Sequence, residues 1–191
     1  TNACVWSKRK KNSAAIDTLK GIIKDNPKSL KAHLALVEIY EKLNKTAEAA
    51  ATYKAIGKLA PDNKVAHYNQ GVFYFENKQY DKAAKSFLKV AKLDRKDVDS
   101  REYLVAVYRQ RKRSREALAI LAELIKLRPT HWDYYRQSFE LYDGLGAYEE
   151  MTRIFARAVA KAPKQPELKF FLGSAYEKRG LLPEAINQFE A

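Results

Sequence analysis

The sequence predicts an all-α solenoid built from stacked antiparallel helix pairs. Residues of the same type recur every 34 residues along the 191-residue chain, and the apolar residues within each repeat have helical spacing. Seven Gly and six Pro are too few for the tight turns of an all-β fold, whereas Ala, Leu, Lys and Glu, which favour helix, dominate. A fixed period of this length is typical of solenoids, because each unit buries its apolar faces against its neighbours.

Four ladders of residues share the 34-residue period. They are Pro27, Pro61, Pro129 and Pro163, with Arg95 on the remaining rung; Trp6, Tyr40, Tyr74, Tyr108, Tyr142 and Tyr176; Ala15, Ala49, Ala83, Ala117, Met151 and Ala185; and Leu19, Tyr53, Phe87, Leu121, Phe155 and Phe189. We therefore expect about eleven helices and no strand, with Tyr74 and Ala83 in the core.

The period divides the chain into six units of one solenoid domain. They are a partial first repeat over residues 1–29, repeats over 30–63, 64–97, 98–131 and 132–165, and a truncated sixth repeat over 166–191. Solenoids normally finish with a polar capping helix, and neither end of this chain has one. We expect a fragment of a longer repeat array; the alternative is self-association through the uncapped ends.

The second unit illustrates the helix pair. Its apolar positions are Leu36, Val37 and Tyr40 on a first helix, and Ala49, Tyr53 and Ile56 on a second. These spacings place one apolar stripe on each helix. The break between the helices falls near Asn44, and the second helix ends before Pro61, which cannot continue it. In the first unit the same pattern predicts the break near Lys8–Lys11, after only the tail of a first helix.

The third unit, AHYNQGVFYFENKQYDKAAKSFLKVAKLD from Ala66 to Asp94, resembles the tetratricopeptide repeat (TPR) family. That family has an aromatic residue late in the first helix (helix A), Ala and Phe or Tyr in the second (helix B), and a closing Pro. The resemblance covers essentially the whole chain and implies a right-handed superhelix that acts as an interaction scaffold and not as an enzyme. The fifth unit, with Trp132, Tyr134 and Tyr135, is similar to the half-a-TPR variant.

The resemblance also implies a ligand groove lined by five positions of each helix A. The candidate groove residues are Leu34, Glu38, Glu41, Tyr68, Asn69, Val72, Phe75, Glu102, Tyr103, Arg109, Arg136, Glu140, Asp143, Phe170 and Phe171. All groove positions together hold three basic and nine acidic residues, in a chain of net charge +13. We expect a protein or peptide ligand that is basic or neutral, steered by the acidic residues and anchored on Tyr68, Phe75 and Tyr103.

Acidic chaperone tails are disfavoured as ligands. Family members that bind such tails use a clamp of Lys, Asn, Asn, Lys and Arg over three A helices. Asn69 matches one clamp position, but Leu34, Glu38, Asp99 and Tyr103 occupy the others. Acidic residues at these positions repel a terminal carboxylate.

The basic residues concentrate in the turns between helices A and B. This basic ridge consists of Lys8, Arg9, Lys10, Lys11, Lys42, Lys45, Lys78, Arg111, Lys112, Arg113, Arg115, Lys178 and Arg179. The ridge either confers solubility or contacts a polyanion or a membrane surface. The alternative function is therefore a polymer-binding module, with RNA or an acidic surface on the ridge, or a cationic glycan in the acidic aromatic groove.

The sequence contains no pattern of catalytic or metal-binding chemistry. His33 and His67 occupy a packing position of helix A, His131 falls in a turn, and Cys4 has no nearby base. Gly-rich phosphate loops are absent. We expect no cofactor, no metal and no enzymatic activity. No apolar run approaches the roughly 20 residues of a membrane span, so we expect a soluble chain, and no feature indicates a compartment.

Overall fold

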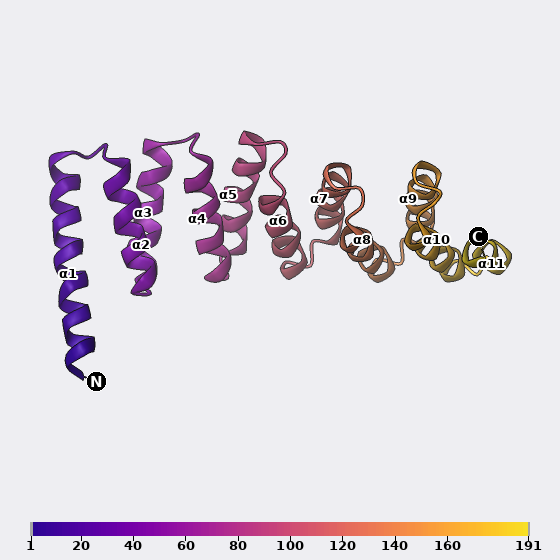
Figure 1. The fold of residues 1–191 in the computed structure, drawn as a ribbon, viewed down its shortest axis with the longest axis horizontal. Coiled ribbons are helices and arrows are strands. Elements are labelled where there is room, and N and C mark those ends of the chain that lie inside the picture. The colour runs from indigo at the N-terminus through magenta and orange to yellow at the C-terminus, as the bar shows by residue number, and fades with distance from the viewer. Residues whose placement is uncertain (1, 191) are drawn as a thin grey trace. The chain divides into compact units, whose positions relative to one another are not determined.

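The computed structural model describes residues 2–190, which contain eleven α-helices and no β-strand (Figure 1). The helices are α1 (Asn2–Asp25), α2 (Leu30–Lys42), α3 (Thr46–Leu59), α4 (Lys64–Glu76), α5 (Tyr80–Leu93), α6 (Asp99–Gln110), α7 (Ser114–Leu127), α8 (Trp132–Gly144), α9 (Tyr148–Lys161), α10 (Pro166–Lys178) and α11 (Leu182–Glu190). The expected helical architecture is confirmed.

The helices fall into two compact units, residues 1–100 and 101–191. The first unit contains α1 to α5, and the second contains α6, apart from its first two residues, to α11. The A–B pairs are α2 with α3 and α4 with α5 in the first unit, and α6 with α7, α8 with α9 and α10 with α11 in the second.

Each A–B turn contains one residue in the left-handed conformation. These residues are Asn44, Lys78, Lys112, Gly146 and Gly180, with φ between 54° and 73°, and they recur every 34 residues. The amide of the next residue donates a hydrogen bond of 2.8–3.0 Å to the carbonyl of the periodic tyrosine of helix A, such as Lys45 to Tyr40. This geometry closes the C-terminus of a helix and satisfies carbonyls that the helix leaves unpaired. The conformation of the A–B turn therefore recurs with the same 34-residue period as the packing residues.

The start of α1 corrects one expectation. Residues 2–25 form a single helix, so the break predicted at Lys8–Lys11 is wrong. Lys10 stands where the other units have their left-handed residue, and a non-glycine residue in that conformation costs about 1–2 kcal/mol. In the other units the packing of a full helix A against helix B offsets this cost. Around Lys10 the lysine-rich stretch continues as helix and avoids this cost.

Small residues of helix B let the two backbones of a pair approach. Ala49, Ala83 and Ala117 are completely buried, and Met151, the one large residue of this ladder, is also completely buried. In the ladder of larger residues one turn further on, Phe87, Leu121 and Phe155 are also completely buried, whereas Phe189 at the end of α11 is exposed. Tyr74 and Ala83 both lie in the core, which confirms the packing register expected from the sequence.

The N-termini of the A helices also follow the period, with a difference between the two units. The side chains of Ser29, Asn63 and Asp97 accept hydrogen bonds from the backbone amides three residues later, at 3.4, 2.9 and 2.8 Å. His131 and Gln165 stand at the equivalent positions of α8 and α10 and make no such bond from their side chains. Helices α8 and α10, which carry the candidate site described below, thus lack a stabilising cap.

Candidate functional site

In the first unit the predicted groove aromatics pack against their own helix pair. Tyr68 is half-buried, with its ring edge-on to Phe87 at 5.9 Å, and Phe75 is half-buried against Tyr80 at 5.7 Å. Leu34 and Val72 are also half-buried, whereas Asn69 is exposed. Part of the surface of each aromatic ring is therefore already covered by packing within its own helix pair.

The acidic groove residues of the first unit have partners as well. Glu38 forms an ion pair of 2.6 Å with Lys42, a residue of the predicted basic ridge. The hydroxyl of Tyr53 donates a hydrogen bond of 2.8 Å to the carboxylate of Glu41. Burial, and secondarily the nearby carboxylates, raise the pKa of Glu41 above its usual value although the tyrosine hydroxyl lowers it. The groove and the ridge are therefore not electrostatically separate.

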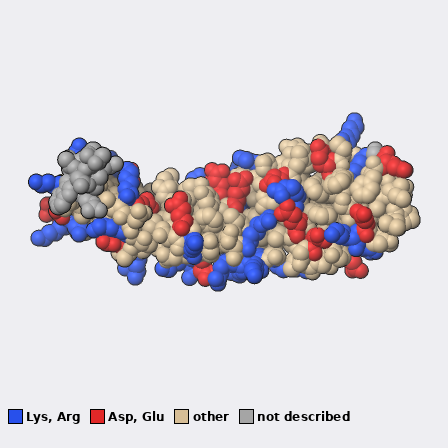
Figure 2. Space-filling model, turned by 90° about the horizontal axis from the view of Figure 1, so that it is seen from below, with Lys and Arg blue, Asp and Glu red and all other residues tan. Residues whose placement is uncertain are grey.

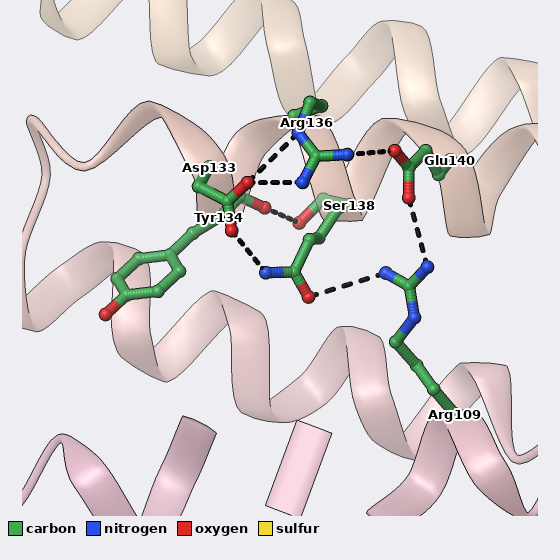
Figure 3. A network of polar contacts seen from close by, with 7 residues as sticks. Arg109, Asp133, Tyr134, Arg136, Ser138 and Glu140 are labelled. Carbon is green, nitrogen blue, oxygen red and sulfur yellow. Dashed lines mark hydrogen bonds and ion pairs between the residues drawn. The ribbon is translucent and has the colours of Figure 1, made fainter. Parts of the chain in front are cut away.

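In the second unit, helices α6 and α8 form a closed polar ring of five residues, which we define as Arg109, Asp133, Arg136, Gln137 and Glu140 (Figure 3). Arg109 donates to Glu140 at 3.1 Å and to Gln137 at 3.4 Å. Gln137 donates to Asp133 at 2.6 Å, and Arg136 bridges Asp133 and Glu140. All five residues stand at groove positions of their A helices, three of them among the candidate groove residues, and the structure brings them together.

The other predicted acidic residues of this unit are also engaged. The hydroxyl of Tyr134 donates to Glu102, and burial followed by this bond raises the pKa of Tyr134 to about 12. Asp143 forms an ion pair of 3.0 Å with Lys178, another ridge residue. Tyr103 is half-buried.

Two cavities border the polar ring. One, of about 430 Å³, is lined by Glu102, Val105, Ala106, Arg109, Gln110, Leu121, Leu124, His131, Asp133, Tyr134 and Gln137. The other, of about 500 Å³, lies between α8 and α10, and we call it the aromatic pocket; it is lined by Trp132, Asp133, Arg136, Pro166, Glu167, Phe170 and Phe171. Asp133 belongs to both cavities, so they adjoin at the ring.

The two predicted phenylalanines of α10 have different environments. Phe171 packs against Phe139 at 5.8 Å and Phe155 at 5.4 Å, at the edge of the core. Phe170 is 59% exposed and faces the aromatic pocket. Phe170 therefore presents most of its ring for contact with a ligand, whereas Phe171 forms a fixed wall.

The residues of the site that were not predicted for the groove include Trp132, Tyr134 and Pro166. Trp132 and Pro166 are 34 residues apart, at the first position of their A helices, which the family pattern does not count among its groove positions. Tyr134 stands where the second and third units have Ala32 and Ala66. A large residue at a position that is otherwise small was the signal that could have identified it.

The basic ridge is exposed but partly paired. Lys45 and Arg113 form ion pairs with acidic residues of their own helix B at 3.5 and 2.6 Å, and Arg115 pairs with Glu150. On the face that Figure 2 presents, basic and acidic side chains are interleaved. Lys78, Arg111, Lys112 and Arg179 are exposed, as are Lys10 and Lys11 on α1. The side chains of Lys8 and Arg9 lie outside the described residues.

The histidines have structural contacts. His33 is buried, with Nδ1 at 2.9 Å from the carbonyl of Ser29, and Nε2 of His67 lies 2.8 Å from the carbonyl of Pro61. Within residues 2–190 as described, no group of three or more His, Cys, Asp or Glu side chains is arranged to hold a metal ion. No described helix combines the length and the apolar character that crossing a membrane requires. The side chain of Cys4 lies outside the described part.

Three family models described as the tetratricopeptide repeat match residues 8–70, 65–97 and 140–191. The chain belongs to the tetratricopeptide repeat family. These TPR matches cover both units and agree with the helix pairs and the periodic turns. No curated protein sequence matches the chain at a significant level.

Solved structures of other TPR proteins share the fold. MamA is 20% identical with a TM-score of 0.58, over 84% of this chain and 88% of its own. YrrB, described as a TPR protein with an unusual peptide-binding site, is 18% identical with a TM-score of 0.57, over 90% and 89%. A complex of Naa15 and Naa10 with HypK includes a chain that is 19% identical with a TM-score of 0.73, covering 97% of this chain and 29% of that one. At these identities the likeness concerns the fold alone.

Proposed function

We propose that this TPR chain is an interaction scaffold that binds a peptide segment or helix of a partner protein. The ligand lies along the second unit, over α6, α8 and α10, and is basic or neutral with apolar anchors. The observation that carries the proposal is the exposed ring of Phe170 in a pocket of about 500 Å³ that adjoins a polar ring. Peptide binding by YrrB and partner binding in the Naa15 complex are consistent with such a role in this fold.

The polar ring gives the proposed site a defined geometry. Each of its side chains is held by at least two others, so the groups that face the groove lose little conformational entropy when a ligand binds. The carboxylate of Glu140 contacts both arginines, and Asp133 contacts Arg136 and Gln137. Lone pairs of these oxygens remain for donors of a ligand, which favours basic over acidic segments.

The anchors of the proposed site differ between the units. Tyr103 lies on α6 within the proposed site, whereas Tyr68 and Phe75 lie on α4 in the first unit, and all three side chains are half-buried. Phe170, which is 59% exposed, leaves a larger fraction of its surface uncovered than these half-buried residues. Aromatic residues in a concave site dominate interface energetics when a partner desolvates them. We therefore place the main anchor at α10.

Selection from a displayed library of random 12-residue peptides tests the proposal. Selected peptides are titrated calorimetrically into the wild-type chain and into Phe170→Ala. The control is Leu88→Ala on α5, which removes an exposed apolar side chain from the first unit, whereas Phe189 is unsuitable because its ring lies 6.0 Å from that of Phe170. We expect Phe170→Ala to weaken binding at least about tenfold and the control to leave it within about twofold. A library that yields no binding peptide, or peptides indifferent to Phe170, would contradict the proposed function.

A further inference from the structure

We propose that the aromatic pocket accepts an arginine side chain of the bound segment. The inference rests on the proposed function and adds the chemistry of the principal anchor. Three features of the second unit support it: rigid aromatic walls, an excess of carboxylates in the lining, and an existing guanidinium whose own partners hold it in place.

The walls of the pocket are fixed from behind. Trp132 packs on Tyr135 at 5.7 Å, and Tyr135 is buried. Phe171 is held by its contacts with the core ring of Phe155. Phe170 meets Phe171 at 6.0 Å with an interplanar angle of 67°, so the two rings form a corner with one exposed face. A side chain that enters this corner meets rings that need little rearrangement.

The charges that line the pocket favour a cation. Asp133 and Glu167 supply two carboxylates, against the single guanidinium of Arg136. That guanidinium already bonds to Asp133 and Glu140. Its proximity holds the pKa of Asp133 below the usual range, so this carboxylate stays ionised. Glu167 is exposed in the first turn of α10 and offers its oxygens to an incoming donor.

Arginine uses these features together better than other side chains. Its planar guanidinium stacks on aromatic faces and donates several hydrogen bonds in one plane, whereas a lysine ammonium is a compact and strongly hydrated charge. Its aliphatic stem packs against Pro166 and the rings in the way that long cationic side chains cover apolar surface. A leucine would fill the volume but leave Glu167 without a partner.

Trp132 provides a direct reporter of the pocket. The chain has two tryptophans, so Trp6→Phe leaves Trp132 as the only one. The probes are acetyl-Gly-Arg-Gly-amide and the same tripeptide with citrulline, lysine or leucine at the centre, each titrated while the fluorescence of Trp132 is recorded. Citrulline has the shape of arginine without its charge, so this comparison isolates the contribution of the cation.

We expect the arginine probe to bind about five- to tenfold more tightly than the citrulline and leucine probes. Glu167→Gln should remove most of this preference, whereas Glu177→Gln, an exposed carboxylate near the other end of α10, should preserve it. Equal binding of the arginine and leucine probes, or a preference unaffected by Glu167→Gln, would overturn the arginine assignment.

The outcomes separate this inference from the proposed function. If display-selected peptides bind through Phe170 but the tripeptides show no preference for arginine, the groove function holds and the anchor is apolar. If the arginine probe binds at Trp132 as expected while the library yields no groove-dependent peptide, the pocket recognises a cation and the scaffold function is the part that fails.

Discussion

A glycine on helix α4 should tolerate replacement by alanine less well than its counterpart on α10. A Cβ built on Gly71 would lie 2.6 Å from the nearest ring carbon of Phe87, and a Cβ on Gly173 would lie 2.5 Å from the ring of Phe189. The two glycines occupy equivalent positions of their repeats, three periods apart. The partner rings differ, because Phe87 is completely buried and Phe189 is 48% exposed.

The expected magnitudes follow from this difference. At Gly71 the ring must retreat by several tenths of an ångström within a packed core, also displacing Tyr68, and such overpacking costs about 1–3 kcal/mol. At Gly173 the ring of Phe189 can rotate toward solvent. Alanine is favoured over glycine in a helix by about 1 kcal/mol at either position, so this contribution cancels when the variants are compared. Gly71→Ala should therefore be about 1–3 kcal/mol less stable than Gly173→Ala.

Urea denaturation followed by circular dichroism at 222 nm measures the comparison. We expect Gly71→Ala to unfold at a lower urea concentration than wild type or close to it, and Gly173→Ala at the same or a higher concentration. If both alanines raise the midpoint equally, the tight approach of α4 to Phe87 is not a feature of the folded protein. If Gly173→Ala is the less stable variant, the reasoning from the exposure of the two rings is refuted.

Three further predictions concern caps, pH and the ridge. Asn63→Ala should lower the free energy of unfolding by about 1 kcal/mol because it removes the N-cap of α4, whereas Gln165→Asp should raise it by a similar amount by supplying one to α10. Glu41→Gln should melt above wild type at pH 7, because burial raises the pKa of Glu41 and the folded state therefore disfavours the ionised carboxylate. The stability linked to this raised pKa is present below about pH 4.5 and is lost as the pH rises through the folded-state pKa. The difference in melting temperature between the variant and wild type should therefore vanish near pH 4. Replacing the basic residues of the α6–α7 turn, Arg111, Lys112 and Arg113, with glutamates should lower the salt concentration at which the chain elutes from heparin.

Each of these predictions has an outcome that contradicts it. Unchanged denaturation midpoints for both cap variants would show that the N-termini of α4 and α10 do not limit stability. A Glu41→Gln variant that melts below wild type at pH 7 would show that the bond from Tyr53 outweighs the burial of the charge. For heparin, the control reverses three exposed lysines of the B helices, namely Lys54, Lys58 and Lys92. Equal losses in both triple variants would mean that net charge alone governs retention.

The fold was predictable because its determinants are local and periodic. The second helix of a pair ends just before Pro61 or its counterpart, as α3 does at Leu59. The buried alanine ladder that includes Ala83 recurs where the backbones of a pair approach each other. The continuous helix α1 was not predictable from the period. At Lys10 the repeat pattern and the helix propensity of a lysine-rich stretch disagree, and the pattern prevails only where a full helix A packs against helix B.

The candidate site was predictable in position but not in its pairings. The family pattern identified Arg109, Arg136 and Glu140 on neighbouring A helices, yet nothing in their spacing indicated that they form a closed ring. Their net charge suggested free acidic side chains, whereas each of the five predicted steering carboxylates has a partner in the structure. Side-chain rotamers decide which of these residues bond to each other, and the accessible rotamers depend on the angle between consecutive helix pairs. Trp132 was not predicted for the site because it stands at the first position of its A helix, outside the groove positions of the family pattern.

Amide chemical-shift mapping shows whether the groove of the second unit is the binding surface. A display-selected peptide is titrated into the ¹⁵N-labelled chain while the backbone amides, the side-chain amide of Gln137 and the indole of Trp132 are monitored. We expect the largest shifts on α6, α8 and α10, with both side-chain signals among them. Shifts confined to α1–α5, or to the basic turns around Lys45 and Lys112, would contradict the account.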